Sequence, residues 1–136
     1  MKPKYMLDTN ICIYLMKHHP PQVRARFAEC FVGEVVISAI TLAELQFGVA
    51  CSGESRARNK AALNSLLEDI PVAPFDDRAA STYGPLRAAD RERNKDALDK
   101  LIASHAMSLG VVLVTNNEAD FRNFNGLAIE NWINNH

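Results

Sequence analysis

Short apolar runs separated by helical stretches constrain the fold of this chain more than any other feature. The clearest run covers residues 111–114, directly after Gly110, and the run at 34–37 is rich in valine and isoleucine. Continuous apolar runs of this kind are typical of strands that are buried on both faces of a parallel sheet. Shorter runs occupy residues 4–7, 70–73 and 127–129, and Pro71 restricts the second of these to an edge or a very short strand.

Helical periodicity fills the segments between these runs. A helical pattern begins at Asp8 and is stopped by Pro20 and Pro21, and further helices are expected over residues 22–27, 41–49, 58–67, 76–91, 97–109 and 118–122. Gly84 and Pro85 predict a break or kink in the helix 76–91, and Gly110 is suited to end the helix 97–109. We therefore expect an α/β fold with a mostly parallel central sheet of about five strands, flanked by helices. The length of 136 residues fits a single domain over residues 1–136.

The composition is that of an ordinary soluble protein, with 48% hydrophobic and 23% charged residues. No apolar stretch approaches the roughly 20 residues that cross a membrane, and three cysteines without a CxxC pair favour a reducing cytoplasm. Since the net charge is only −1, binding of nucleic acid needs local clusters of basic residues. Two such clusters are present, although a solvated helix face explains the second at least as well: Arg56, Arg58 and Lys60, and Arg87, Arg91, Arg93, Lys95 and Lys100.

Polar residues follow two of the expected strands at their carboxyl ends, where open α/β sheets bind their ligands. Asp8 directly follows the first strand, although capping of the next helix by Asp8 or Thr9 explains it equally well. The clearest strand leads into residues 115–121, which offer a hydroxyl, two amides and two acids. Capping of a short helix favours the same residue types. Among them we expect an acidic contribution from Asp120 and positioning groups at Thr115 and Asn117.

Two further acids lie on helix faces that are otherwise apolar or small. Glu44 shares a stripe with Ile40, Ala43 and Phe47, and Asp99 shares a face with Ile102, Ala103 and Ala106. A carboxylate on a buried face is costly unless it is paired or bound to a cation. Glu44 could instead reach the edge of the core or pair with an arginine. Asp99 could be a favourable first-turn charge, although Asp96 offers the better helix cap.

Several converging acids without a histidine partner predict a site for Mg²⁺ or Mn²⁺ rather than zinc, because hard cations take oxygen ligands. Such a site hydrolyses phosphodiesters through a metal-activated water. Without the metal, the clustered carboxylates repel one another and raise at least one pKa. Other chemistries fit worse, since the sequence has no GxG phosphate-binding turn and no GxSxG nucleophile elbow. His105 is expected to be structural.

The residues in question fall in four segments: 6–10 (MLDTN), 41–48 (TLAELQFG), 99–106 (DKLIASHA) and 114–117 (VTNN). Together, and in this order and spacing, they closely resemble the PIN-domain family and, more narrowly, the VapC-type toxins of bacterial toxin–antitoxin systems. The C-terminal segment 126–132 also matches that group, so the resemblance runs essentially end to end. It implies a single PIN domain with a Rossmann-like parallel sheet.

The resemblance also implies an Mg²⁺- or Mn²⁺-dependent endoribonuclease that cuts structured RNA and inhibits translation. Initiator transfer RNA, in the anticodon stem-loop, is the leading substrate by analogy. By position, Asp8 and Asp99 match the family's principal metal ligands and Glu44 its third acid. Many family members carry a fourth acid where this chain has Asn117, and Asp120 is the expected substitute among the catalytic residues. Residues expected to help bind the cofactor are Thr9, Asn10, Thr115 and Asn117.

Partners follow from the same resemblance. It implies a homodimer and a VapB-type antitoxin that blocks the site, with higher-order assembly on operator DNA. A different class of function stays open: a non-catalytic metal- or partner-binding module that acts in transcriptional autoregulation with its antitoxin, for which Asn117 in place of an acid leaves room. A phosphatase with Asp8 as nucleophile is a third reading, but its DxD motif needs an acid where this chain has Asn10.

Overall fold

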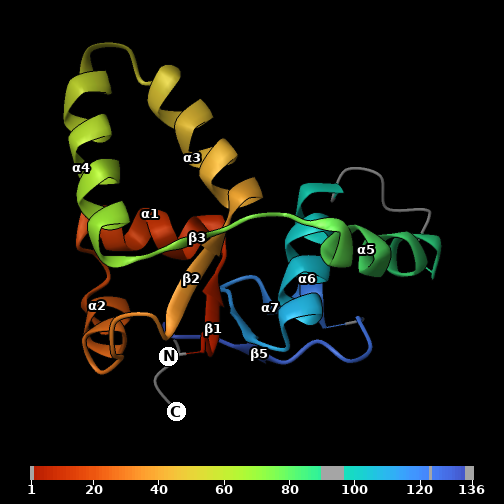
Figure 1. Cartoon of the computed structure of the whole chain (residues 1–136). Helices are drawn as coiled ribbons and strands as arrows, with labels where there is room; N and C mark the ends of the chain where they lie inside the picture. The colour runs from red at the N-terminus through yellow and green to blue at the C-terminus, as the bar shows by residue number, and fades with distance from the viewer. Residues whose placement is uncertain (1, 90–96, 123, 134–136) are drawn as a thin grey trace.

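Five parallel strands form the centre of the protein, in the order β3–β2–β1–β4–β5 (Figure 1). The computed structural model describes residues 2–89, 97–122 and 124–133. The strands are β1 (Tyr5–Leu7), β2 (Val35–Ser38), β3 (Val72–Ala73), β4 (Val112–Val114) and β5 (Ile129–Glu130). The helices are α1 (Thr9–Lys17), α2 (Pro21–Ala28), α3 (Ala39–Ala50), the 3₁₀ turn η1 (Gly53–Ser55), α4 (Arg56–Asp69), α5 (Asp77–Ala89), α6 (Ala97–Leu109) and α7 (Glu118–Phe121). The predicted α/β class with a parallel sheet is confirmed.

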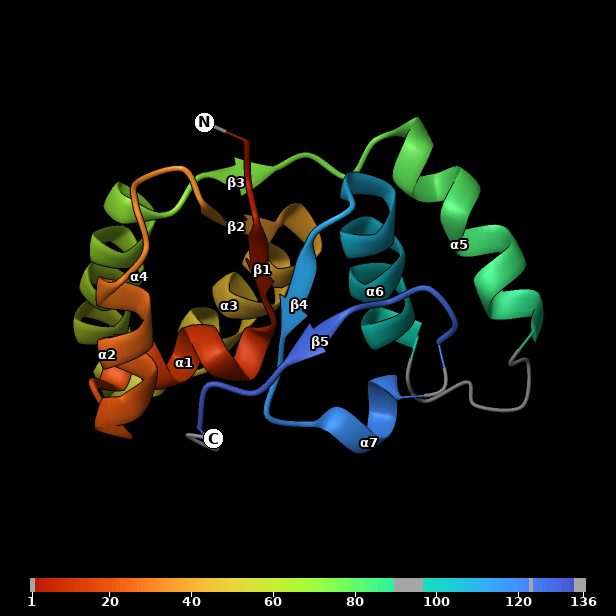
Figure 2. The same ribbon diagram turned by 90° about the horizontal axis from the view of Figure 1, so that it is seen from below.

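The sheet separates two hydrophobic cores, and successive residues of β1 alternate between them. Tyr5 and Leu7 belong to the core formed with α1, α2, α3 and α4, whereas Met6 belongs to the core formed with α6 and Phe121 of α7. Figure 2 shows α1, α3 and α4 on one side of the strands and α5 and α6 on the other. This alternation follows from the two-residue period of a strand. Because both faces are covered, the central strands β1 and β4 consist of hydrophobic residues only, as the sequence predicts.

Most expected boundaries agree with the structure. Helix α6 begins and ends at the predicted residues, and Gly110 follows it with φ +67°, the left-handed conformation that favours glycine at a helix end. β3 is an edge strand, as Pro71 requires. Of the predicted break or kink at Pro85, the break is wrong, because α5 continues through this residue, and the kink stays a prediction. The carbonyl group that loses its partner there belongs to Ser81, an exposed residue that water can reach. Within the described residues, no helix is long and apolar enough to cross a membrane.

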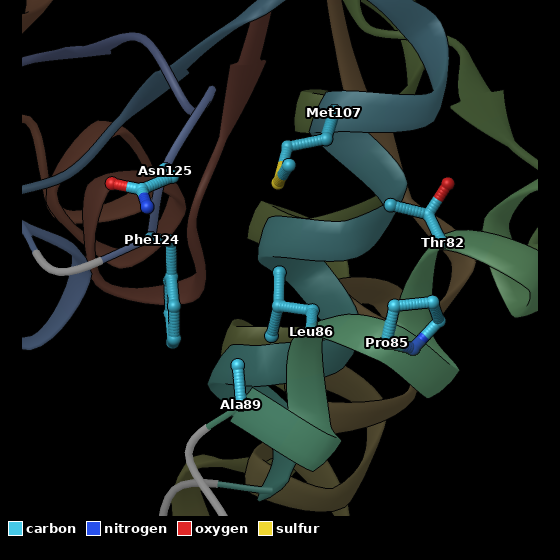
Figure 3. Close-up of a pocket in the computed structure, with 7 residues that line it drawn as sticks. All are labelled: Thr82, Pro85, Leu86, Ala89, Met107, Phe124 and Asn125. Atoms are coloured by element: carbon cyan, nitrogen blue, oxygen red, sulfur yellow. The ribbon is translucent and has the colours of Figure 1, made fainter.

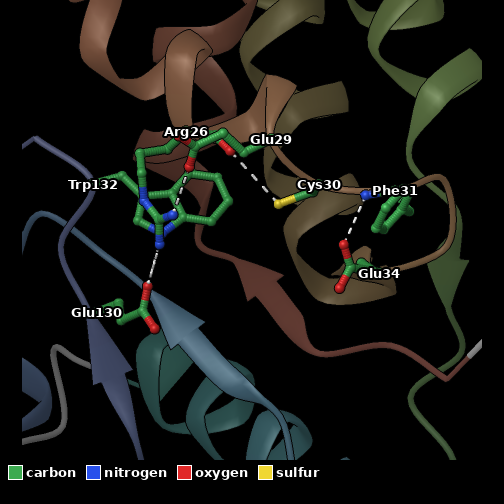
Figure 4. A network of polar contacts seen from close by, with 7 residues as sticks. All are labelled: Arg26, Glu29, Cys30, Phe31, Glu34, Glu130 and Trp132. Atoms are coloured by element: carbon green, nitrogen blue, oxygen red, sulfur yellow. Dashed lines mark hydrogen bonds and ion pairs between the residues drawn. The ribbon is translucent and has the colours of Figure 1, made fainter.

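The C-terminal segment is tied to α2 by a polar network around Trp132 (Figure 4). The Arg26 guanidinium donates to Glu130 at 2.9 Å and to Glu29 at 3.0 Å, and it lies 5.3 Å from the ring centroid of Trp132. The Trp132 indole N–H donates to Glu130 at 3.1 Å, so one carboxylate serves both groups. Trp132 also packs edge-on against Tyr5 of β1. The network thereby holds the end of β5 against β1 and α2, which fixes the sheet edge that leads to the candidate site.

Candidate active site

Asp8 lies at the carboxyl end of β1, the central strand of the sheet. Its main-chain N–H donates to the carbonyl of Val114 on β4 at 3.0 Å, and its side chain is only 6% exposed. The carboxylate accepts the N–H of Ile11 at 3.0 Å, so Asp8 caps α1 as one of the two interpretations expects. It also accepts hydrogen bonds from the Thr115 hydroxyl and from the main-chain N–H of Asn10. Asp8 therefore caps a helix and at the same time lies at the carboxyl ends of the neighbouring strands β1 and β4.

The surroundings of Asp8 favour its protonated form. Burial is the main cause that raises the pKa of this carboxyl group, and the negative charge of Glu44 raises it further. The hydrogen bonds from Thr115 and from the main chain lower the pKa, but the net shift is upward. The charge of Asp8 also raises the pKa of Cys12, although burial is the larger cause there. A cation bound beside Asp8 would remove this penalty on the ionised form.

Glu44 faces Asp8 from the middle of α3. Its Oε1 accepts a hydrogen bond of 2.7 Å from the hydroxyl of Thr9, the first residue of α1. The prediction that Glu44 lies on the buried face of its helix is wrong, however. The stripe that it shares with Phe47 is not the buried face of α3, since Phe47 is 70% exposed. The buried face consists instead of Thr41, Leu45 and Val49, and Glu44 is half-buried at its border.

The loop after β4 connects to Asp8 through Thr115. The Thr115 hydroxyl accepts the main-chain N–H of Asn117 at 2.9 Å while it donates to Asp8, so its orientation is fixed from both sides. The Asn117 side-chain amide donates to the Asp120 carboxylate. Asp120 thus holds Asn117, whose main chain in turn holds Thr115. Asn10 is exposed and contacts Asp8 through its main-chain N–H.

Asp99 lies in the first turn of α6, on the other side of the sheet from Glu44. Since α6 runs antiparallel to β4 and is joined to it through Gly110, its first turn lies toward the carboxyl end of β4 (Figure 2). The face that Asp99 shares with Ile102, Ala103 and Ala106 is buried, as predicted, and Asp99 itself is half-buried. Asp96, the expected cap, lies outside the described residues.

The donor set at this edge of the sheet fits a hard cation in part. Two carboxylates, Asp8 and Glu44, converge with the hydroxyls of Thr9 and Thr115, and Mg²⁺ is commonly held by only one or two carboxylates with water and substrate phosphate. Among the described residues, no three Asp, Glu, His or Cys side chains lie close enough together to form a metal site on their own. The place of Asp99 as a metal ligand therefore stays a prediction.

The expectation that Lys100 belongs to a basic surface cluster is wrong. Lys100 is only 1% exposed and cannot join a basic surface, because it lies among the buried residues of α6. Among the cysteines, Cys51 is exposed after the last turn of α3 and Cys12 is buried. The basic residues Arg91, Arg93 and Lys95 lie outside the described residues. Exposed positive charge beside α3 comes from Arg56, Arg58 and Lys60 on α4.

Sequence reasoning missed the partner of His105. The His105 ring donates to the carbonyl of Pro74 and its Nδ1 lies 2.8 Å from Ser38 Oγ, so the Ser38 hydroxyl donates to Nδ1. Ser38 Oγ also accepts the N–H of Ile40 and caps α3. The bond therefore links α6, which carries Asp99, to the start of α3, which carries Glu44. The helix periodicity places His105 in the core, as predicted, but it cannot name Ser38, which is 67 residues away.

A second set of missed contacts lies beside Thr115. The Asn116 side chain donates to the Tyr14 hydroxyl at 3.4 Å and accepts from the Asn131 amide at 3.4 Å, and Asn131 also donates to Glu118 at 3.2 Å. These bonds join the loop after β4 to α1 and to the C-terminal segment. No local pattern could identify them, because the partners are far apart in the sequence.

Two cavities lie at different distances from the acids. One, of about 490 Å³, lies between α5, α6 and Phe124, and its walls include Leu86 and Met107 but none of the predicted site residues (Figure 3). The other, of about 280 Å³, lies between α1, α3 and α4 and has Glu44 in its wall. The second cavity thus borders the candidate site at Glu44, and the first does not contact it.

Known proteins resemble this chain over nearly its whole length. A model of the PIN domain matches residues 5–127. The tRNA(fMet)-specific endonuclease VapC of Shigella flexneri is 40% identical over 131 residues, which cover 95% of this chain and 98% of the relative. Ribonuclease VapC2 of Haemophilus influenzae is 36% identical, with 96% and 98% covered.

Solved structures of toxin–antitoxin complexes have the same fold. The DNA-bound VapBC complex of Salmonella typhimurium contains a chain with a TM-score of 0.85 and 37% identity, covering 96% of this chain and 98% of that one. VapBC2 of Rickettsia felis, bound to a DNA fragment from its promoter, gives a TM-score of 0.83 and 36% identity, with 94% and 98% covered. With the parallel sheet, the acid-bearing strand ends and these similarities together, the chain belongs to the PIN-domain family, among its VapC-type members.

Proposed function

We propose that this protein is a metal-dependent endoribonuclease, the toxin of a toxin–antitoxin module. The observation that carries the proposal is the convergence of Asp8 and Glu44 with the Thr115 hydroxyl at the carboxyl ends of β1 and β4. Ribonuclease names among relatives that are 36–40% identical over almost the full chain support the reaction class. PIN-domain ribonucleases are generally metal-dependent, which agrees with a site made of oxygen donors.

In this proposal Asp8, Glu44 and Asp99 hold Mg²⁺ or Mn²⁺. The bound ion supplies the Lewis acidity that activates water and neutralises charge on the phosphate. Thr9 fixes the rotamer of Glu44 through its 2.7 Å hydrogen bond, and Thr115 orients the carboxylate of Asp8. The burial of Asp8 limits competition from bulk water for its oxygen atoms. Asp120 and Asn117 act one step away by holding Thr115 in place.

The names of the relatives suggest a substrate and partners for this protein. We propose a structured RNA as substrate, with initiator transfer RNA first among the candidates, since one relative of 40% identity is named for tRNA(fMet). Cleavage in the anticodon stem-loop would inhibit translation. We further propose a VapB-type antitoxin as the inhibitory partner, a homodimer as the unit of assembly, and binding of the complex to operator DNA, because similar chains are found in DNA-bound VapBC complexes.

The direct test is cleavage of total cellular RNA and of initiator transfer RNA by the purified chain. Cleavage is expected with Mg²⁺ or Mn²⁺, none with EDTA, and none with the Asp8→Asn or Glu44→Gln variant. Glu68→Gln is the matched control, since Glu68 is an exposed glutamate of α4 outside the site, and it should cut like the parent. Mapping of 5′ ends then identifies the substrate and the cleaved bond.

Two outcomes would contradict the proposal. If Asp8→Asn and Glu44→Gln cut RNA as fast as the parent, the residues named here do not form the active site. If the parent cuts no cellular RNA with either metal but still binds its antitoxin, a non-catalytic regulatory module explains the protein better. Binding of the antitoxin, measured by calorimetry, therefore accompanies the cleavage assay.

A further inference from the structure

A pocket of about 280 Å³ opens beside Glu44, between α1, α3 and α4. Its walls are mainly apolar, formed by Ile13, Met16, Leu45, Val49 and Ala62, and the polar groups at its border are Lys17, Glu44 and Asn59. The volume exceeds that of a purine ring. Since Glu44 also hydrogen-bonds Thr9 and acts electrostatically on Asp8, a ligand in this pocket would contact one of the acids of the candidate site.

Gly48 keeps this pocket open. It lies in the last turn of α3, where glycine is a poorer helix former than alanine, and its φ is not in the left-handed region. A Cβ added to Gly48 would meet no heavy atom within 4 Å. Neither the backbone nor a steric contact with the described residues therefore requires glycine here. Gly84 of α5 is also unobstructed, but it precedes Pro85, whose ring crowds a preceding side chain.

The polar groups at the border match a nucleotide. The Asn59 amide offers both a donor and an acceptor, as the edge of a base requires. Lys17 is an exposed cation at the end of α1, suited to a phosphate. Single-stranded loops of RNA are recognised through unstacked bases, whose edges hydrogen-bond to the protein. The apolar wall, the Asn59 amide and the Lys17 ammonium group match the face, the edge and the phosphate of such a nucleotide, while the third polar group, Glu44, is assigned to the metal by the proposed function.

We propose that this pocket is a base-binding subsite for RNA, in which a nucleobase beside the cleaved phosphodiester lies over Gly48, with Asn59 at its edge and Lys17 on an adjacent phosphate. The inference rests on the proposed ribonuclease function and adds the element that selects the cleaved position. It makes Gly48, Asn59 and Lys17 specificity residues without a role in the bond-breaking step.

The test separates binding from cleavage. Eight-nucleotide RNAs, derived from the mapped cleavage site or from the anticodon loop of initiator transfer RNA, carry 2-aminopurine at one position at a time and are titrated with protein in EDTA. Gly48→Met fills the pocket, and Ala50→Met adds the same side chain to an exposed position of the same helix that does not line it. We expect the 2-aminopurine emission to change on binding at one position, and Gly48→Met to abolish that change and raise Kd by about tenfold or more. Ala50→Met should do neither.

Two milder variants keep the test independent of the fold of Gly48→Met. Lys17→Gln should lower the slope of log Kd against log salt by about one unit, as expected for the loss of one phosphate contact. Asn59→Leu should weaken the preference among RNAs that differ only in the base at the sensitive position. Thermal unfolding of each variant identifies any loss of fold.

The outcomes distinguish this inference from the proposed function. If the parent cleaves RNA and folded Gly48→Met binds and cuts the same RNAs with unchanged Kd and unchanged site, the subsite is refuted while the ribonuclease stands. If the parent never cleaves but Gly48→Met still abolishes the emission change, the nucleotide pocket stands and the ribonuclease does not. If Gly48→Met leaves RNA binding intact and weakens only the antitoxin, the occupant is a peptide and the inference is overturned.

Discussion

The hydroxyl of Thr9 donates a hydrogen bond of 2.7 Å to Oε1 of Glu44, which joins the first residue of α1 to the middle of α3. One candidate acid, Asp8, directly precedes Thr9 in the sequence. The other, Glu44, accepts the hydrogen bond from the Thr9 hydroxyl. The bond therefore sets the orientation of Glu44 relative to Asp8. This relationship is the starting point for the first prediction.

Thr9→Val removes the hydroxyl and keeps the shape of the side chain. We expect kcat/KM for RNA cleavage to fall by about 10- to 100-fold, the usual range for loss of a group that orients a metal ligand. Thr9→Ser keeps the donor and should retain most of the activity. Circular dichroism and thermal unfolding check that both variants fold. Equal activity of the valine and serine variants would mean that the orientation of Glu44 does not matter for the reaction.

Asp8→Asn is expected to stabilise the protein while it abolishes activity. The pKa of Asp8 is raised from its ordinary value of 3.8 by burial, so the folded state binds the proton more tightly than the unfolded state. Stability contributed by the protonated form is complete below pH 3.8 and is lost as the pH rises through the raised pKa. Asparagine does not ionise and still caps a helix well. The free energy of unfolding in urea at pH 7 should therefore rise.

The pH dependence provides the control for this prediction. The difference between Asp8→Asn and the parent should shrink as the pH falls, and it should be lost below pH 3.8, where the parent carboxyl group becomes protonated in both states. Added Mg²⁺ should raise the melting temperature of the parent and leave that of the variant unchanged. A variant that is less stable than the parent at pH 7 would contradict the view that the ionised carboxylate is destabilising in the folded protein.

Substitution of Asp120 distinguishes a positioning role of this residue from direct metal binding. Since Asp120 accepts from the Asn117 amide, and Asn117 is linked through Thr115 to Asp8, Asp120→Ala should lower kcat/KM by about tenfold. Asp8→Asn should lower it by about a thousandfold or more, because it removes a direct ligand. Binding of Mn²⁺ is the second measurement, and Asp120→Ala should leave its affinity nearly unchanged. Equal losses in Asp120→Ala and Asp8→Asn would make Asp120 a ligand.

The burial of His105 leads us to expect that the protein loses stability in mild acid. Burial lowers the pKa of His105 from its ordinary value of 6.5, although the nearby charge of Asp76 acts in the opposite direction. The folded state therefore binds this proton more weakly than the unfolded state. The contribution of the neutral His105 ring to the free energy of unfolding is complete above pH 6.5, and it is lost as the pH falls through the lowered pKa. The free energy of unfolding between pH 7.5 and 5.5 should fall by more in the parent than in His105→Gln. Parallel curves would show that the pKa of His105 is the same in the folded and unfolded states, which contradicts the prediction.

The sequence predicts α6 well and α3 only in part, for a physical reason. In α6 the apolar residues Ile102, Ala103 and Ala106 occupy one face, so the periodicity alone identifies the side that meets the sheet. In α3 apolar residues lie all around the helix, and the stripe through Phe47 looked as suitable as the true buried face. Which face is buried is decided by packing against α1, α4 and β2, and this information is spread over the whole chain.

The candidate site was predictable residue by residue but not as a geometry. Asp8 and Thr115 are recognisable because they follow apolar strands, and their contact needs only that β1 and β4 be neighbours. The bond from Thr9 to Glu44 spans 35 residues, and no local pattern indicates it. Lys100 shows the opposite error, since a basic residue in a charged segment is expected at the surface, whereas the amphipathic face of α6 places it inside.

The strict alternation of β1 between the two cores has a consequence for the tolerance of this protein to change. Substituting one aliphatic residue for another in residues 5–7 changes only how well a core is filled. Inserting or deleting a single residue there would exchange the two faces of the strand, so that Met6 and Leu7 would trade cores. The same shift by one position would point Asp8 away from Thr115 and Glu44. Natural and designed variants of β1 can therefore differ in side-chain size but must keep its length.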